Sequence, residues 1–188
     1  MASSTRPSRP DRRNRRTPRK QARRVPLLPA MPDARFWIGA TVLLVLCLAC
    51  YWPTLRPGTD FVWDDVAITD NRIVKTPGGI IDIWFRPSEN SHEEHYWPLV
   101  YTTFWTEYHV YKLLVPSSGG LWAPGFRGVN VLVHVANCVL IWLLLRRLAV
   151  KGAWFGAALF AVHPVHAESV AWIIERKDVL SGLFYLLA

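Results

Sequence analysis

Cysteine is scarce in this chain: the three residues of this type, Cys47, Cys50 and Cys138, all lie in apolar stretches. None has the spacing of a disulfide framework or a zinc cluster, so we expect packing residues and predict no metal site. The sequence also lacks a 34-residue repeat, which excludes a tetratricopeptide array within these 188 residues.

Acidic residues are nearly missing from residues 1–35, which hold eleven Arg and Lys against two Asp. The remainder has eleven Arg and Lys against twelve Asp and Glu, so the net charge of +8 belongs to this tail. Because few apolar side chains precede Val25, we expect the tail to be disordered. Basic tails can bind nucleic acid, but a position before an apolar run favours a cytoplasmic anchor at anionic lipid headgroups. We therefore expect no nucleic-acid partner.

Charge is absent from several long apolar runs, which predict membrane helices. The first, "FWIGATVLLVLCLACYW", is at the short end of what crosses a hydrocarbon layer of ~30 Å. A signal peptide is the alternative, but the basic segment of 35 residues before the run is too long for the n-region of a signal peptide. The last run covers only about half a bilayer before Ala188. We therefore expect the chain to be the N-terminal part of a longer protein.

These runs predict an all-α polytopic membrane protein surrounded by the lipid bilayer. Positive charge in the tail and in "RRLAVK" marks both as cytoplasmic, because basic loops stay inside. The predicted segments are a tail (1–35), membrane helices (36–52, 128–145, 152–163 and a truncated 179–188), extracytoplasmic segments (53–127 and 164–178) and a cytoplasmic turn (146–151). This topology brings the acidic pair in "FVWDD" and the segment "HPVHAESVAWIIERKD" to one face of the membrane.

Two polar patterns interrupt the apolar sequence. Residues 98–115 carry ionisable groups that argue against a membrane span. Their apolar residues form one helical stripe, which predicts a helix lying in the outer membrane–water interface. Thr103, Thr106 and Glu107 lie off this stripe. The stripe consists of Val100, Phe104, Tyr108, Tyr111 and Val115. In residues 128–145, polar groups at intervals of four and three predict a face turned toward other helices or a wet cavity. These are Asn130, His134 and Asn137.

Three clusters of ionisable residues are candidates for chemistry. Asp64 and Asp65 are either a helix cap or a general base whose aromatic neighbours limit water access. "HPVHAE" (163–168) is an incomplete metal site or a helix start after a break. "ERKD" (175–178) is a salt-bridged collar or a phosphate site. We interpret "HEEH" (92–95) as a solvated loop, with metal binding as the alternative.

A carboxylate base and cations beside a membrane favour one reaction. A deprotonated hydroxyl attacks a sugar carbon and expels a lipid-linked phosphate, whose developing charge the cations stabilise. Such a direct displacement inverts the sugar carbon.

The phrases "FVWDDVAITDNRIV", "YWPLVYTTFW" and "GAALFAVHPVHAESVAWIIERKDVLSGLFYLLA" resemble the bacterial relatives of the transmembrane and tetratricopeptide-repeat O-mannosyltransferases, of the GT-C glycosyltransferase class. The resemblance covers about residues 61–188. It implies a GT-C helical core with a long first outer loop, and further membrane helices and a repeat array downstream. This stretch alone is then expected to be inactive.

The resemblance also implies an activity: transfer of a sugar, possibly mannose in this family, from a polyprenyl-phosphate donor to a hydroxyl of an acceptor protein. The location would be the outer face of a bacterial inner membrane. By resemblance Asp64 is the base and Asp65 places a substrate, and the donor is held by His163, His166, Glu168, Arg176 and Lys177. No cofactor is firmly implied, and a divalent metal requirement is left open. The alternative is a non-enzymatic membrane scaffold for a repeat domain.

Two positions depart from the family pattern. Arg127 stands in "GFRGVN" where the family has a histidine, and Trp97 stands in "YWPL" where animal members have an arginine. These differences bear on donor or acceptor specificity more than on the fold.

Overall fold

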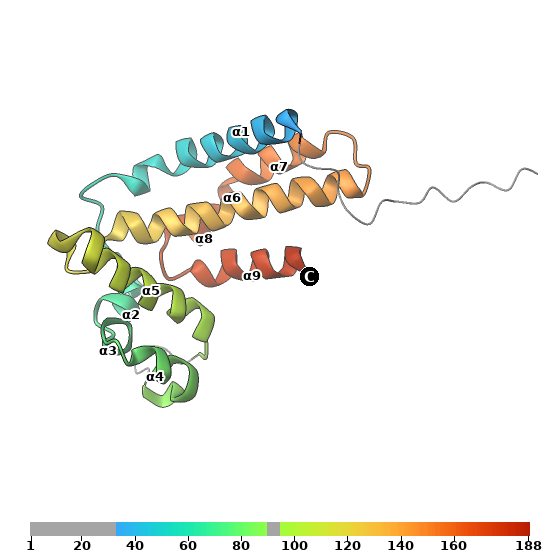
Figure 1. The fold of residues 1–188 in the computed structure, drawn as a ribbon. Helices are drawn as coiled ribbons and strands as arrows, with labels where there is room; N and C mark the ends of the chain where they lie inside the picture. The colour runs from blue at the N-terminus through green and yellow to red at the C-terminus, as the bar shows by residue number, and fades with distance from the viewer. Residues whose placement is uncertain (1–32, 90–94) are drawn as a thin grey trace, which may run out of the picture. The chain divides into compact units, whose positions relative to one another are not determined.

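A computed structural model describes residues 33–89 and 95–188 (Figure 1). The chain divides into two units, Met1–Pro32 and Asp33–Ala188, and the structure described below is that of the second. The predictions for the basic tail lie outside the described residues, as do those for three of the four residues of "HEEH".

Every regular element in the two described ranges is a helix, which confirms the predicted all-α class. The longer helices are α1 (Ala34–Tyr51), α5 (Pro98–Leu114), α6 (Ala123–Arg147), α7 (Ala153–Val162) and α9 (Arg176–Leu187). The shorter ones are α2 (Val66–Thr69), α3 (Arg72–Lys75), α4 (Gly79–Phe85) and α8 (Ala167–Ala171). Short 3₁₀ turns lie at Trp52–Leu55, Trp63–Asp65, Pro87–Glu89, Pro116–Ser118 and Pro164–His166.

Two helices of the described unit are long and apolar enough to cross a membrane. They are α1 with its following turn, Ala34–Leu55, and α6. The apolar surface of α1 is largely uncovered, since Trp37 and Ile38 are 60% and 64% exposed. An apolar helix face of this kind requires apolar surroundings. The chain is therefore an all-α membrane protein.

Helix α6 begins earlier than predicted, and helix α7 is short. Helix α6 begins five residues before the predicted residue 128, because Pro124 in its first turn is suited to a helix start and Arg127 is buried inside the helix. Helix α7 has ten residues, or about 15 Å, half the thickness of a hydrocarbon core. It is not one of the two candidate spans, and a third crossing over residues 152–163 stays a prediction.

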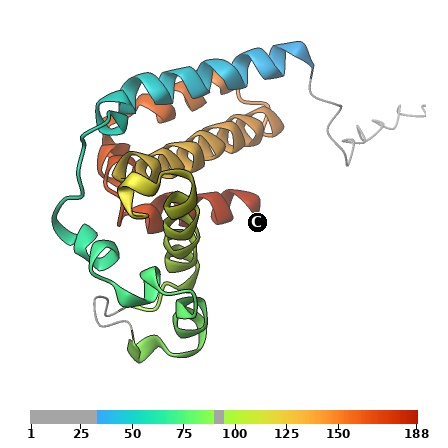
Figure 2. The same cartoon turned by 60° about the vertical axis from the view of Figure 1, so that its left-hand side comes forward.

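Helix α6 is the central element of the unit. It packs against α1, α7 and α9, and both views show it between α1 and α9 (Figures 1 and 2). Helices α3 and α4 pack on α5, beside the N-terminal end of α6. The described residues between the two candidate spans therefore form a folded cap, in which the short helices pack on α5.

Two apolar clusters hold this arrangement. One lies between α1, α6 and α7 and includes Leu43, Cys47, Cys138, Trp142, Ala157 and Ala161. The other lies among α5, the start of α6 and the short helices, and includes Ile68, Ile73, Phe104, Phe126 and Ile173. Val100, Phe104 and Tyr108 of the predicted stripe on α5 are buried, so much of that stripe packs against protein.

Candidate functional site

The acidic pair is divided between two environments. Asp65 is fully buried, whereas Asp64 is exposed. Asp65 Oδ2 accepts a hydrogen bond from the Val62 amide at 3.0 Å, and Oδ1 accepts one from the Ile174 amide at 3.2 Å. Burial raises the pKa of Asp65, and its two amide donors act in the opposite direction. Asp65 is thus the anchor that joins the acidic loop to the segment before α9.

This anchor brings together two segments that are far apart in the sequence and that were predicted to lie on one face of the membrane. The bond from Ile174 to Asp65 spans 109 residues, and it brings the "FVWDD" loop against the "HPVHAESVAWIIERKD" segment. The helix-cap interpretation also holds in part, since the bond from the Val62 amide closes the 3₁₀ turn Trp63–Asp65.

Asp64 is presented on a strained turn. Trp63, the residue before it, has a φ of +47°, a value that is costly for a bulky side chain and that tends to occur at functional sites. The Trp63 side chain is 83% exposed and meets Trp172 edge-on at 6.0 Å. Within the described ranges, the Asp64 carboxylate has no hydrogen bond or ion pair. The exposed Asp64 carboxylate is therefore able to contact a substrate molecule.

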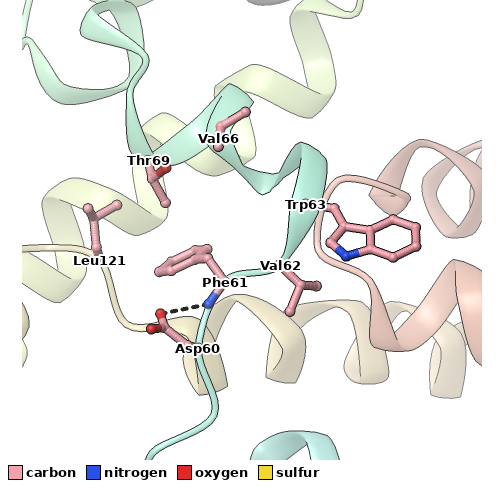
Figure 3. A pocket seen from close by; sticks show the side chains of 7 residues that line it. All are labelled: Asp60, Phe61, Val62, Trp63, Val66, Thr69 and Leu121. Atoms are coloured by element: carbon pink, nitrogen blue, oxygen red, sulfur yellow. Dashed lines mark hydrogen bonds between the residues drawn. The ribbon is translucent and has the colours of Figure 1, made fainter.

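A pocket of about 410 Å³ opens beside this loop (Figure 3). Asp60 forms the acidic side of the pocket. The Asp60 carboxylate accepts a hydrogen bond from the Phe61 amide at 2.7 Å. The remaining lining is mainly apolar and aromatic: Phe61, Val62, Trp63, Val66, Thr69 and Leu121. Aromatic faces with a nearby carboxylate form a site that can hold a small hydroxylated molecule.

Arg127 connects this pocket to the helix core. Its Nε donates to the Ala171 carbonyl at 3.2 Å, and its Nη2 donates to the Asp60 carbonyl. Its Nη1 is buried and has no hydrogen-bond partner among the described residues, and the same is true of Trp172 Nε1. A buried donor left unpaired costs about 1–3 kcal/mol, so these two donors mark a place where a further acceptor is favourable.

Arg176 is the best-satisfied charged group of the described unit. It is fully buried, and Nε donates to Asn130 Oδ1 at 2.7 Å. Nη1 donates to Thr103 Oγ1 at 2.9 Å and to Glu107 Oε1. Nη2 donates to Glu107 Oε2 at 3.2 Å and to the Phe126 carbonyl at 2.7 Å. All five N–H groups of the guanidinium thus have protein acceptors.

Glu107 is the partner that sequence reasoning missed. It was expected off the apolar stripe of α5, yet it is only 8% exposed. Burial raises its pKa to about 7, while the Arg176 charge acts to lower it. The guanidinium also lies 4.5 Å from the centre of the Phe104 ring. No spacing rule joins Glu107 to a residue on a distant helix, so the only usable signal was an acid inside an otherwise apolar helix.

Three other predicted site residues lie between the end of α7 and the first turn of α8. His163 is exposed and its Nδ1 accepts the Val165 amide at 3.2 Å, and Glu168 is exposed in the first turn of α8. His166 is half-buried. Burial lowers the pKa of His166, and the charge of the neighbouring His163 lowers it further. Within the described residues none of these three makes a hydrogen bond or ion pair with the acidic pair.

Lys177 is the accessible cation of this region. Its ammonium pairs with Glu175 at 2.7 Å and lies 4.7 Å from the ring centre of Trp97. A second pocket, of about 400 Å³, lies between α5 and α9 next to it. It is lined by Trp97, Pro98, Leu99, Val100, Lys177, Asp178, Leu180, Ser181 and Phe184, none of which lines the first pocket.

The polar face predicted on α6 is confirmed as helix-to-helix contact. Asn130 Nδ2 donates to the Trp172 carbonyl at 3.0 Å, His134 Nε2 to the Ala161 carbonyl at 3.2 Å, and Asn137 Nδ2 to the Val179 carbonyl at 2.9 Å. These bonds tie α6 to α7 and to the α8–α9 region. The expectation that Asn130, His134 and Asn137 join helices therefore holds.

No family model and no solved structure matches the chain. Curated proteins do match. Human protein O-mannosyl-transferase TMTC4 is 33% identical over 186 residues, which is 86% of this chain and 24% of the relative. Mouse protein O-mannosyl-transferase TMTC3 is 35% identical, over 79% of this chain and 16% of the relative. Human protein O-mannosyl-transferase TMTC1 is 37% identical, over 80% of this chain and 17% of the relative.

The fold and the site define a helical membrane protein in which an acidic loop is held against the segment before α9 and Arg176 and Glu107 form a buried ion pair. These similarities make the chain a homologue of the TMTC O-mannosyltransferases over most of its own length. It spans between 16% and 24% of the length of the relatives just described.

Proposed function

We propose that the full-length protein is a membrane glycosyltransferase that moves a sugar, mannose by analogy with its relatives, from a polyprenyl-phosphate donor to a hydroxyl of a protein. The division of the acidic pair carries this proposal: Asp65 is buried and anchors the loop, whereas Asp64 is exposed and directly follows Trp63, which lines the aromatic pocket. One carboxylate positions the other. This is the arrangement that a general base requires.

In the proposed reaction, Asp64 takes the proton of the acceptor hydroxyl as its oxygen attacks the anomeric carbon of the sugar. The bond from that carbon to the phosphate oxygen breaks with inversion, and the lipid phosphate leaves with the electron pair.

Lys177 is the cation that we assign to the leaving phosphate. It is accessible and lies beside an apolar pocket that suits a prenyl chain. Arg176 is assigned the positioning role, because every N–H group of its guanidinium already has a protein acceptor. His163, His166 and Glu168 remain proposed contacts of the donor.

The test is sugar transfer by the full-length protein in membranes, with polyprenyl-phosphate mannose as donor. Asp64→Asn is expected to lower the rate about 100-fold or more, the usual contribution of a general base. Asp70→Asn, an exposed acid five residues beyond the anchor, is the matched control and should transfer at the parental rate. Transfer by Asp64→Asn at the parental rate would contradict the assignment and favour the scaffold alternative.

We also propose that the N-terminus is cytoplasmic and that Asp64 and Glu168 face the outside of a bacterial inner membrane. Both residues and Lys151 are exposed. In a background without native cysteines, Asp64→Cys and Glu168→Cys should react with an impermeant maleimide added to intact cells. Lys151→Cys should react only after lysis. Opposite accessibility of Asp64→Cys and Glu168→Cys would rule out a shared face.

A further inference from the structure

Cys47, His134 and Cys138 converge inside the helix core, although their sequence spacing predicted packing residues and no metal site. One ligand atom from each lies within 4.8 Å of those of the other two. Both cysteines are fully buried and His134 is 1% exposed. His134 and Cys138 are one turn apart on α6 and therefore share a face, and Cys47 meets that face from α1.

The geometry fits a single cation. Three atoms within 4.8 Å of one another all lie within about 2.8 Å of a common centre. Metal–sulfur and metal–nitrogen bonds to zinc are about 2.3 and 2.0–2.1 Å, so an inward movement of less than about 1 Å completes the coordination. Rotation of two cysteine side chains is sufficient for such a movement.

A hydrogen bond of His134 leaves its Nδ1 atom as the ring nitrogen that can bind a metal. His134 Nε2 lies 3.2 Å from the Ala161 carbonyl, and because a carbonyl only accepts, Nε2 carries the proton. The Nδ1 atom then has its lone pair available. Metal-binding histidines commonly donate their other N–H to a backbone carbonyl in this way.

The chemistry of the donor set selects a soft cation. Two thiolates and one imidazole are ligands that favour zinc or monovalent copper over calcium or magnesium. The surroundings are apolar, where net charge is costly. Two thiolates balance the charge of Zn²⁺, and one thiolate with one thiol balances Cu⁺.

A series of imidazoles leads from the surface to this cluster. His163 is exposed and His166 half-buried. Their rings are 6.3 Å apart, and the His166 ring is 5.3 Å from that of His134. Each ring is a ligand that can pass a soft cation inward.

We propose that Cys47, His134 and Cys138 bind one soft d¹⁰ cation, zinc or monovalent copper, and thereby clamp α1 to α6. This site is separate from the acidic loop and does not depend on the proposed transfer reaction. Binding releases thiol protons. Because the ligands come from two helices, occupancy should also stabilise the helix pair.

The test is metal binding by purified full-length protein in detergent, first stripped of metal. In separate arms, Zn²⁺ and Cu⁺ compete against a chromophoric chelator. We expect one equivalent to bind in at least one arm and Cys47→Ala or Cys138→Ala to weaken binding about 100-fold or more, beyond the 10–100-fold effect of a lost supporting group. Cys50→Ala is the matched control, because Cys50 is exposed and outside the cluster, and it should bind as the parent does.

A second measurement serves if the alanine variants do not fold. In the unmodified protein, the bound cation should protect Cys47 and Cys138 from a membrane-permeable alkylating reagent, while Cys50 reacts with or without metal. No binding in either arm, equal binding by Cys47→Ala, absence of protection, or a covalent bond between Cys47 and Cys138 in the purified protein would each overturn the proposal.

Discussion

Arg176→Met is expected to lower the free energy of unfolding by about 3–5 kcal/mol, the usual cost of removing one member of a buried ion pair. The substitution leaves the Glu107 carboxylate buried without its counter-ion. It also removes the donor to the Phe126 carbonyl and to Asn130. Thermal unfolding of the full-length protein in detergent, followed by circular dichroism, measures the loss.

The two partners of this pair should show strong coupling. Glu107→Gln alone is also expected to destabilise, since it leaves a buried guanidinium charge uncompensated. Combining Arg176→Met with Glu107→Gln should cost less than the sum of the single changes, because neither charge is then left alone. Additive effects would mean that the pair does not interact in the folded protein.

An exposed ion pair provides the control. Arg72 contacts Glu89 at 3.2 Å, and its side chain is 62% exposed. Arg72→Met is expected to change stability by less than about 1 kcal/mol, because solvent screens a surface pair. An effect as large as that of Arg176→Met would show that burial is not the cause of the difference.

Asp65→Ala is expected to cost about 2–4 kcal/mol of stability. It leaves the Val62 and Ile174 amides without acceptors, and an unpaired buried donor costs about 1–3 kcal/mol. Its matched control is Asp64→Ala, an exposed neighbour whose removal should leave stability nearly unchanged. Unfolding in detergent compares them, and equal losses for the two variants would contradict the division of the acidic pair.

The pH dependence of Asp65 should run opposite to that of most acids. Because its folded-state pKa is raised, the folded protein binds a proton more readily than the unfolded chain. The Asp65 contribution to stability is therefore largest at low pH and declines as pH rises from the ordinary aspartate pKa through the raised one. Asp65→Asn should make the stability curve flatter in that range, and an unchanged curve would contradict the raised pKa.

The two carboxylates of "FVWDD" could not be told apart in sequence by their chemistry. The resemblance assigned Asp64 as base and Asp65 as a placing group, and the assignment of catalysis is still a prediction. The structure adds the physical difference: Asp65 is within reach of the Ile174 amide, and Asp64 is not buried. Sequence neighbours have opposite environments here because the 3₁₀ turn points consecutive side chains in different directions.

The assignment of Arg176 to a donor phosphate shows the limit of reading charge from sequence. A basic residue beside a membrane helix is an apt phosphate ligand, and "ERKD" gives no sign of which of its two cations is buried. In the structure Arg176 is enclosed by protein acceptors, while Lys177 contacts Trp97 and has exposed surface. That distinction depends on Glu107, which lies 69 residues away.

The sequence by itself determined the long apolar helices and the helix-facing polar stripe of α6, because these follow from composition and a period of 3.6 residues. It also supplied the family, through phrases that the relatives share. Only the tertiary structure decided which polar groups meet: Glu107 with Arg176, Asp65 with Ile174, and Cys47 with His134 and Cys138. Periodicity fixes the face on which a side chain lies, whereas its partner on another helix is fixed by how the helices pack.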